Sequence, residues 1–568
     1  MQRPGALKHL PWLAMLLALP TLWLPFMLDD TFHRLALEGW LSGEAAHPYF
    51  DGWVDPYGLP SCFRFFEPGR GEHFMPWWTD PDLTIRFWRP LSSLDALVDH
   101  VAFGDRAWAW HLHSVLWYGV LVAAACSVYR LALGPVALVA AGLFAVDETH
   151  FLPVAWIANR NAIIAGALGL FGLSAHLRWR SGSSKHGVLA PLLLTAGLLG
   201  GEAALGVFGY IGAYELHRWR RQGPSWHILP ALLVGLGWAA HYKVQGFGSV
   251  GSGNYLDPTA QPLEYLAEVA VRLPMLVQAQ FLGIPSDLGL FVPFSAPILT
   301  ALGAVVLLGL GLGWRPLLAA VSPEEGEALR WMVPGAFLAL FPVMATFPID
   351  RLLLIPGLGF SVVTAAVLRV AWQRGRGWVP IGGIHVVLPA LMWLVGAGFY
   401  GTLLRQNADI IRSTPIAPEV ADRKALVLVA SDPTVGIYLP MELHWEGRDM
   451  PMTWQILSMV KADHILRGTS TGWSLEATSH RMLTQVFELL FRSPRHRPFE
   501  VGQTSSNQGL TVTVSALRDG TPYAVDFVLD RPADWAFLVW SEAGLVEVDK
   551  PAPGEAVDLP WSPGPMGI

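Results

Sequence analysis

Long apolar runs separated by short polar loops dominate the first 404 residues of the chain. A helix rises 1.5 Å per residue, so a run of about 20 apolar residues crosses the hydrocarbon core of a bilayer. Short loops rich in arginine mark the cytoplasmic side, and following them predicts about eleven spans, with the N-terminus inside and the C-terminus outside. The predicted spans are residues 9–28, 107–128, 132–146, 154–177, 187–201, 203–217, 226–242, 293–314, 331–347, 352–372 and 379–403.

Two segments within the first 404 residues do not have the pattern of a simple membrane span. Residues 29–106 are rich in proline, glycine and aromatic residues, and they are too polar to cross and too long for a connector. We expect them to form an outer loop folded against the membrane. Residues 269–292 are partly apolar within an outer stretch, and we interpret them as re-entrant or interfacial.

The pattern changes near residue 405, where charged residues return. Apolar and polar residues alternate in "KALVLVAS", "GLTVTVSAL", "YAVDFVL" and "WAFLVWS". A period of two is typical of half-buried strands. The chain therefore divides by prediction into a membrane domain, 1–404, and a soluble α+β domain outside the membrane, 405–568.

Composition supports the membrane assignment. The chain is 52% hydrophobic and 15% charged, against roughly 25% charged residues in soluble domains. Two cysteines make a disulfide framework improbable, and no basic block of the kind that binds nucleic acid is found. Residues 1–28 are interpreted as a span and not a cleaved signal peptide, since no small-residue cleavage site follows the apolar stretch.

Ionisable residues gather at the predicted outer ends of the spans. Such residues are costly at a membrane and persist mainly where they line a wet cavity or meet a substrate. Asp29 and Asp30 stand directly after the first apolar run. The other candidates are Arg89, His111, Asp147, Glu148, His150, Arg160, Glu202, Asp350 and Arg351. Acids, arginines and histidines on one face suit a reaction between a charged lipid and an external acceptor.

These residues support a resemblance to a known family. "LDDTF" looks like the acidic motif of the GT-C glycosyltransferases, multi-pass enzymes that take sugar from a polyprenyl-phosphate carrier. Further blocks resemble, in order, the protein O-mannosyltransferase-like branch whose eukaryotic members carry tetratricopeptide repeats. The blocks are "FWRPLSSLDALVDHVAFGDRAWAWHLHSVLWYGVLVAAAC", "LFAVDETHFLPVAWIANRNAIIAG", "GGEAALGVFGYIGAYEL" and "PIDRLLLIPGLGF". The fold implied is a polytopic α-helical membrane protein of GT-C type with a C-terminal soluble α+β domain.

The resemblance also implies a function. Asp29 or Asp30 would be the base that deprotonates an acceptor hydroxyl as it attacks the anomeric carbon, with inversion. Arginines would hold the departing lipid phosphate; the candidates are Arg89, Arg160 and Arg351, with His150 assisting. The expected partners are a polyprenyl-phosphate-linked sugar, a protein, lipid or glycan acceptor, and the lipids of a bacterial-type inner membrane. We therefore expect the two acids, Asp29 and Asp30, to share one cavity with these arginines.

Some positions depart from the pattern of the branch. Gly201 and Glu202 replace its Lys-Glu pair, Asp147 and Glu148 replace its His-Pro, and Leu152 replaces its glutamate. Tetratricopeptide repeats are absent from the sequence, and residues 405–568 stand in their place. The sequence therefore predicts neither the sugar nor the acceptor.

Simpler interpretations of these residues stay open. One or both of Asp29 and Asp30 could cap the next helix, and Arg89 could be an interfacial side chain. His111 and His113 lie two apart, so they point to different sides of a helix and do not bind one metal together. "DETH" could bind a divalent cation through carboxylate oxygens. Glu202 could be a turn residue, and Asp350 with Arg351 a local ion pair.

Two other functions compete with the transferase. A transporter or lipid flippase would carry ionisable groups near mid-span and broken helices in paired positions. A non-catalytic assembly protein would act through residues 405–568.

Overall fold

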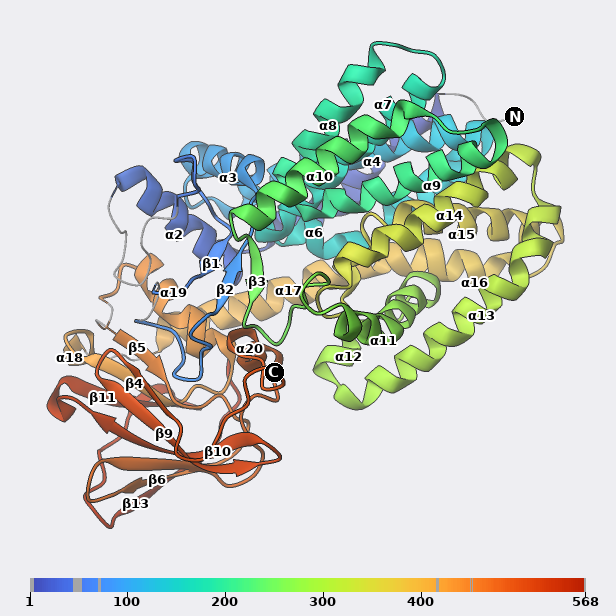
Figure 1. Cartoon of the computed structure of the whole chain (residues 1–568). Coiled ribbons are helices and arrows are strands. Elements are labelled where there is room, and N and C mark those ends of the chain that lie inside the picture. The colour runs from blue at the N-terminus through green and yellow to red at the C-terminus, as the bar shows by residue number, and fades with distance from the viewer. Residues whose placement is uncertain are drawn as a thin grey trace. The chain divides into compact units, whose positions relative to one another are not determined.

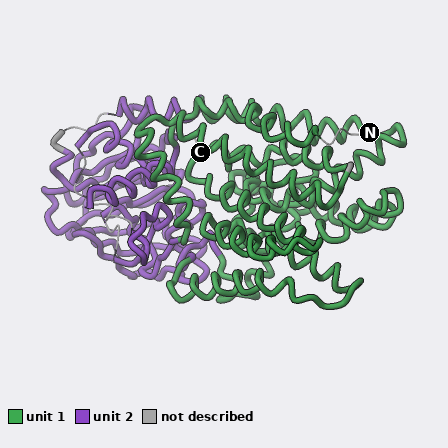
Figure 2. Tube along the Cα trace, turned by 90° about the horizontal axis from the view of Figure 1, so that it is seen from above, with its two compact units in different colours: residues 1–26, 87–247, 256–401 green, residues 27–86, 248–255, 402–568 purple. Residues whose placement is uncertain are grey.

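The computed structural model describes residues 5–43, 54–69, 73–414, 418–449, 451 and 453–565. The chain forms two compact units, each built from separate segments (Figure 2). Unit 1 consists of residues 1–26, 87–247 and 256–401, and unit 2 of residues 27–86, 248–255 and 402–568. The predicted outer loop 29–106 is thus divided at Arg86, and its first part belongs to the same unit as the C-terminal strands.

Unit 1 is helical (Figure 1). Its helices are α1 (Leu10–Ala18), α3 (Pro90–Phe103), α4 (Ala107–Leu133), α5 (Ala137–Val146), α6 (Phe151–Ala155), α7 (Arg160–Arg180), α8 (His186–Gly200), α9 (Leu205–Gln222), α10 (Leu229–Val244), α11 (Pro262–Leu282), α12 (Leu288–Phe291), α13 (Ala296–Ala320), α14 (Pro323–Val343), α15 (Gly357–Gln373), α16 (Trp378–Gly382) and α17 (Leu388–Ser413), whose last turns belong to unit 2.

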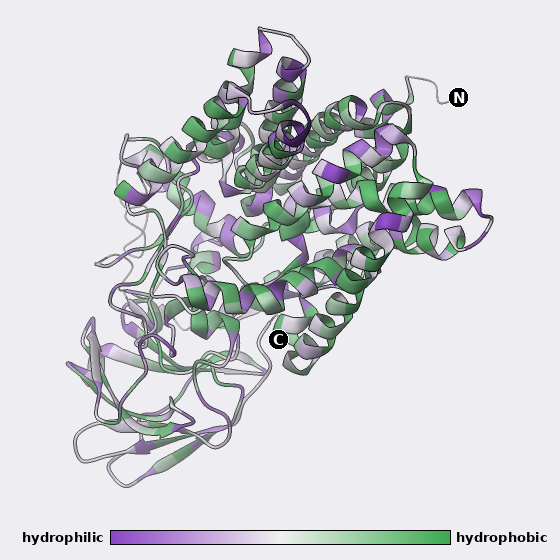
Figure 3. Cartoon of the chain, turned by 45° about the vertical axis from the view of Figure 1, so that its right-hand side comes forward, coloured by the Kyte–Doolittle hydropathy of each residue, from purple (hydrophilic) through white to green (hydrophobic). Residues whose placement is uncertain are grey.

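Four helical segments among the described residues are long and apolar enough to cross a membrane. They are Ala107–Leu133, Ile157–Arg180, Ala296–Ala320 and Trp378–Ser413; a fifth is added if Ala137–Val146 and Glu148–Ala155, bent by 48°, form one span. Figure 3 shows hydrophobic residues over most of the helices. A polytopic helical protein is supported, and the number of eleven spans stays a prediction.

The helix α13 illustrates a lipid-facing surface. Val305, Leu308 and Leu312 are 66%, 62% and 73% exposed within the described structure. In water such a row of apolar side chains would be unfavourable, whereas lipid removes the cost. The exposed apolar row therefore agrees with a membrane environment for α13.

Inside unit 1, small residues bring helices close together. A Cβ added to Gly359 on α15 would lie 2.3 Å from the Met332 carbonyl oxygen on α14. Tyr129 on α4 donates to the Leu358 carbonyl at 2.7 Å. Close backbone contact through small residues and buried hydrogen bonds is how helices associate without a hydrophobic driving force.

Several helix boundaries differ from the predicted spans, and the end of α4 is an example. The sequence suggests a break between two spans at Arg130, whereas α4 continues through it to Leu133. The helix ends at Gly134, whose φ is +55°, a conformation in which only glycine is unstrained. A single arginine does not end a helix because its long side chain can reach toward polar surroundings.

Unit 2 combines short helices with three sheets. The strands β1 (Arg64–Phe66), β2 (Thr84–Arg86) and β3 (Gly248–Val250) form one antiparallel sheet, and α2 spans Asp29–Ser42. The other strands are β4 (Lys424–Val429), β5 (Thr453–Ile456), β6 (His464–Gly468), β7 (Trp473–Ala477), β8 (Thr504–Asn507), β9 (Leu510–Arg518), β10 (Thr521–Leu529), β11 (Trp535–Ser541), β12 (Gly544–Glu547) and β13 (Ala556–Leu559).

The C-terminal strands form two sheets. One has the order β13-β6-β7-β10-β9-β8 and the other β12-β11-β4-β5, in which β4 is parallel to both neighbours. The helices α18 (Pro418–Ala421), α19 (Leu439–Trp445) and α20 (Val486–Phe491) accompany them. All four alternating segments of the sequence are strands, namely β4, β9, β10 and β11, so these predictions are confirmed.

The early segment of unit 2 is hydrogen-bonded to its C-terminal part. The Trp454 amide donates to the His73 carbonyl at 2.8 Å. The indole of Trp77 donates to the Leu457 carbonyl at 3.0 Å, and that of Trp78 to the Glu488 carbonyl at 3.3 Å. Residues 27–86 and 402–568 therefore fold as one body.

Candidate functional site

The two predicted acids of α2 have different surroundings within unit 2. Asp30 is 1% exposed, and its Oδ2 accepts the Met27 amide at 3.0 Å. Leu28, directly before the two acids, has a φ of +47°, a conformation that is strained for a residue with a side chain. Asp30 therefore binds a backbone amide just before the helix, whereas the N-cap position of α2 is taken by Leu28, without a side-chain cap hydrogen bond. Asp29 is half-buried.

The Asp29 carboxylate contacts the C-terminal part of the same unit. The Tyr438 hydroxyl donates to Asp29 Oδ1 at 2.7 Å, across 409 positions of sequence. Next to this contact, the Thr31 hydroxyl donates to Glu442 Oε1 at 2.5 Å. The Arg34 guanidinium lies 3.8 Å from the ring centroid of Trp445. The first turns of α2 are thus held by residues of α19 and of the turn before it.

Burial sets the protonation of these partners. Burial, followed by the charge of Asp29, raises the pKa of Tyr438 well above its ordinary value. Burial also raises the pKa of Glu442, against the hydrogen bond from Thr31. Tyr438 consequently keeps its proton and remains a hydrogen-bond donor to Asp29.

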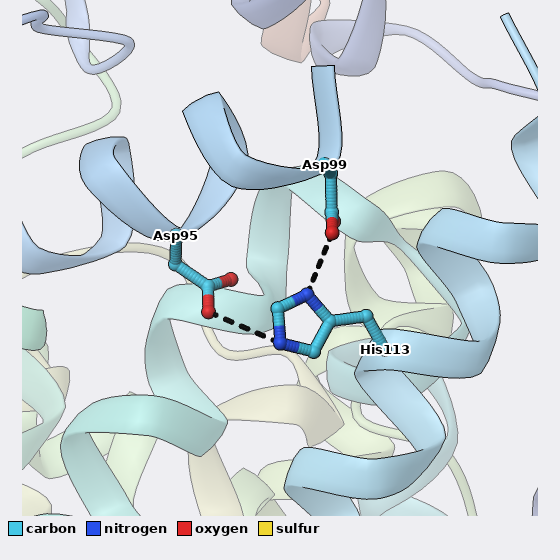
Figure 4. Close-up of side chains that lie close together, drawn as sticks. All are labelled: Asp95, Asp99 and His113. Atoms are coloured by element: carbon cyan, nitrogen blue, oxygen red, sulfur yellow. Dashed lines mark hydrogen bonds and ion pairs between the residues drawn. The ribbon is translucent and has the colours of Figure 1, made fainter. Parts of the chain in front are cut away.

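In unit 1, Arg160 is the centre of a buried ion-pair group. Its Nε lies 2.9 Å from Asp95 Oδ2 and its Nη2 2.5 Å from Asp99 Oδ2. Figure 4 shows His113 between the same two acids, with Nδ1 2.6 Å from Asp99 Oδ1 and Nε2 3.4 Å from Asp95 Oδ1. The guanidinium of Arg160, 2% exposed, is therefore occupied by two carboxylates.

Asp95, Asp99 and His113 also place possible metal-ligand atoms within 4.8 Å of one another. Arg160 competes for the same carboxylates, so a cation would have to displace a guanidinium in a buried setting. We interpret the group as an ion-pair network. Asp95 and Asp99 are not among the predicted site residues, although their spacing of four residues places both on one face of α3.

The "DETH" residues lie at the bend between α5 and α6. Asp147 Oδ1 accepts the Thr149 amide at 3.0 Å, and its Oδ2 accepts the Gln280 side chain at 2.8 Å. His150 Nδ1 lies 3.3 Å from the Tyr118 hydroxyl. Asp147 and Glu148 line a small pocket in unit 1, together with Leu143, Gln280, Ser361, Thr364, His385 and Pro389.

Asp350 and Arg351 contact different partners. Asp350 Oδ1 accepts the amide and hydroxyl of Ser286 at 2.8 and 2.6 Å. The Arg351 guanidinium lies 4.8 Å from the ring centroid of Trp156. These contacts do not make the local Asp350–Arg351 ion pair that the simpler interpretation describes.

Arg89 and Glu202 are brought together from distant parts of the sequence. Arg89 Nε lies 2.6 Å from Glu202 Oε2, and the Tyr242 hydroxyl donates to Glu202 Oε1 at 2.8 Å. Both members of the pair are half-buried. Glu202 lies in the turn between α8 and α9, as the simpler interpretation predicts, and in addition it forms an ion pair with Arg89.

The predicted site residues thus fall into several groups. His111 is fully buried and takes no part in the contacts described above. Asp29 and Asp30 belong to unit 2, and Arg89, Arg160 and Arg351 to unit 1. A common cavity for the acids and the arginines stays a prediction.

No family model matches the chain, and a search of curated proteins found no match. Among solved structures, it is similar to the crystal structure of ArnT from Cupriavidus metallidurans bound to undecaprenyl phosphate, with 15% identity, 79% of this chain and 86% of that chain covered, and a TM-score of 0.35. The apo structure of the same protein gives 14% identity, 78% and 84% coverage and a TM-score of 0.34. Similarity this low assigns neither fold nor activity.

Proposed function

We propose that the chain is a membrane glycosyltransferase of GT-C type that uses a polyprenyl-phosphate-linked sugar at the outer face of a bacterial-type inner membrane. The observation that carries the proposal is the difference between the two acids of the "LDDTF" motif. Asp30 is buried, and its carboxylate accepts the Met27 backbone amide. Asp29 is half-buried, and its carboxylate is oriented by the Tyr438 hydroxyl. A carboxylate that is oriented and still partly accessible is what a general base needs.

The proposed reaction follows from that carboxylate. The acceptor hydroxyl attacks the anomeric carbon, and a new C–O bond forms as the bond from that carbon to the phosphate oxygen breaks. The electron pair leaves on the lipid phosphate, the acceptor proton passes to Asp29, and the anomeric configuration inverts. A base of this kind contributes about 10²–10⁴-fold to the rate.

Arginine is the side chain suited to the leaving phosphate, because its planar guanidinium forms two parallel hydrogen bonds to a phosphate. Of the three candidates, Arg160 already contacts two carboxylates, the buried Asp99 and the half-buried Asp95. Arg89 and Arg351 are half-buried and are the better candidates. Recruiting Arg89 would require a rearrangement of its ion pair with Glu202.

The transporter alternative has less support. It expects broken helices in paired positions, and the described residues contain one bent pair, at Asp147. The assembly alternative makes residues 405–568 independent of the acid pair, but Tyr438 and Glu442 contact the first turn of α2. Neither alternative explains why the half-buried Asp29 carboxylate is held by the Tyr438 hydroxyl.

The test measures transfer from radiolabelled polyprenyl-phosphate mannose, and in parallel glucose, in membranes that contain the Asp29→Asn or Asp30→Asn protein. We expect Asp29→Asn to lose about 100-fold or more and Asp30→Asn to keep most of its activity. Asp558→Asn, an exposed acid on β13, is the matched control. Full transfer by the Asp29→Asn protein would remove the proposed base.

A further inference from the structure

Tyr438 lies at the end of a helical turn, Thr434–Tyr438, that runs directly into α19. Its side chain is 7% exposed, and its ring meets Phe32 of α2 edge-to-face, with centroids 5.8 Å apart. Packing of this kind restricts the ring, so the hydroxyl is fixed as well. The hydroxyl donates its single proton to Asp29 Oδ1.

The contacts beyond Tyr438 repeat at helical spacing. Glu442 follows four positions later and accepts the Thr31 hydroxyl. Trp445 follows seven positions after Tyr438 and lies under the Arg34 guanidinium. Residues at i, i+4 and i+7 share one face of a helix. One face of α19 is thus built against the first two turns of α2, and this fixes the direction in which Asp29 points.

We propose that Tyr438 is a positioning residue that orients the Asp29 carboxylate and favours its ionised form, with Glu442 fixing the turn beside it. This inference rests on the proposed function, in which Asp29 is the base. It assigns to the C-terminal part of the chain a role in the chemistry, because the donor comes from a residue 409 positions after the acid.

The physical consequence is a defined pH dependence. A hydrogen bond donated to a carboxylate stabilises its charged form, so removing the donor makes the carboxylate easier to protonate. The acid limb of the kcat/KM profile reports ionisation of the base in the free enzyme. Tyr438→Phe should therefore shift this limb to higher pH by about one unit. It should also lower kcat while leaving KM for the lipid donor unchanged.

The experiment compares full-length wild-type, Tyr438→Phe and Asp29→Asn proteins in nanodiscs, with polyprenyl-phosphate mannose as donor. Tyr523→Phe is the matched control, since Tyr523 lies on β10 of the same unit and contacts Arg518. A second probe, 3-fluorotyrosine at position 438, keeps the shape of the ring but donates a stronger hydrogen bond. It should shift the acid limb to lower pH, opposite to Tyr438→Phe.

The outcomes separate the two claims. Opposite shifts for the two replacements at position 438, with no shift for Tyr523→Phe, support the inference. If Asp29→Asn abolishes transfer while both replacements at 438 keep the wild-type profile, the positioning role is wrong and the proposed function stands. If Asp29→Asn transfers normally, the proposed function is wrong and the inference falls with it. Should Tyr438→Phe fail to fold, the fluorotyrosine protein decides alone.

Discussion

Arg160 on α7 lies 2.5 Å from Asp99 on α3, and both side chains are buried. The pair joins two helices that precede and follow the 27 residues of α4. Breaking one member of a buried ion pair leaves an uncompensated charge, which costs about 3–5 kcal/mol. The buried pair therefore links α3 to α7 within unit 1.

The first prediction follows from that pair. Asp99→Asn should lower the free energy of unfolding by about 3 kcal/mol, measured by thermal unfolding in detergent. Glu324→Gln, at an exposed position of α14, should change it by less than about 0.5 kcal/mol. Equal stability of the two proteins would contradict the buried-pair assignment.

A second prediction concerns cations. In the wild-type protein the Arg160 guanidinium occupies Asp95 and Asp99, so Mn²⁺ should not raise the unfolding temperature through this group. The Arg160→Ala protein lacks the guanidinium, so the two carboxylates and His113 become free to bind a metal ion. Mn²⁺ should then raise the unfolding temperature of this variant in a concentration-dependent way. Stabilisation of the wild-type protein that is lost in Asp99→Asn would show that the metal binds despite Arg160.

The third prediction separates Asp30 from Asp29 by stability. Asp30→Ala removes the acceptor of the Met27 amide and should cost about 1 kcal/mol, the usual net value of a lost hydrogen bond. Asp30→Asn keeps an oxygen acceptor and should cost less. Thermal unfolding of both proteins measures the difference, and an Asn variant as unstable as the Ala variant would mean that the charge and not the hydrogen bond matters.

A pH dependence is expected from Glu488 in unit 2. Burial raises the pKa of this carboxyl from 4.5 to about 7, against the amide hydrogen bonds of Thr484 and Gln485. The folded protein therefore binds more protons than the unfolded one between these pH values. The contribution of the protonated Glu488 carboxyl to folding stability is fully present below pH 4.5 and is lost as the pH rises through about 7.

The variant Glu488→Gln tests this directly, because the amide cannot ionise. Relative to wild type, it should gain stability as the pH is raised from 4.5 to 7. The measurement is the difference in unfolding temperature between Glu488→Gln and wild type at both ends of this pH range. A difference that stays constant with pH would mean that Glu488 has the same pKa in the folded and unfolded states.

Parts of this architecture can be predicted from local pattern. The alternation in "KALVLVAS" predicts β4 because strand side chains point to opposite faces with a period of two, and the apolar runs predict α4 and α13. The predicted end of the span at residue 128 is wrong, because a charge at Arg130 is a weaker stop signal than a glycine with positive φ at Gly134.

The partners of the candidate residues could not be predicted in this way. Tyr438 meets Asp29, and Glu202 meets Arg89, through tertiary contacts that no periodicity encodes. Asp95 and Asp99 had a readable spacing, but α3 lies inside the segment expected to be an outer loop. The distinction between Asp29 and Asp30 depends on burial, which adjacent identical residues in a sequence do not reveal.

The assembly of unit 2 from both ends of the chain has a consequence for biosynthesis. A ribosome adds about 5–20 residues per second, so roughly 20–80 s pass between the synthesis of Asp29 and that of Tyr438, 409 positions later. Through that interval Trp77 and Trp78 have not yet met the carbonyls that accept their indole protons. A nascent chain released early would leave these rings without their partners, which makes truncated products natural targets for quality-control proteases.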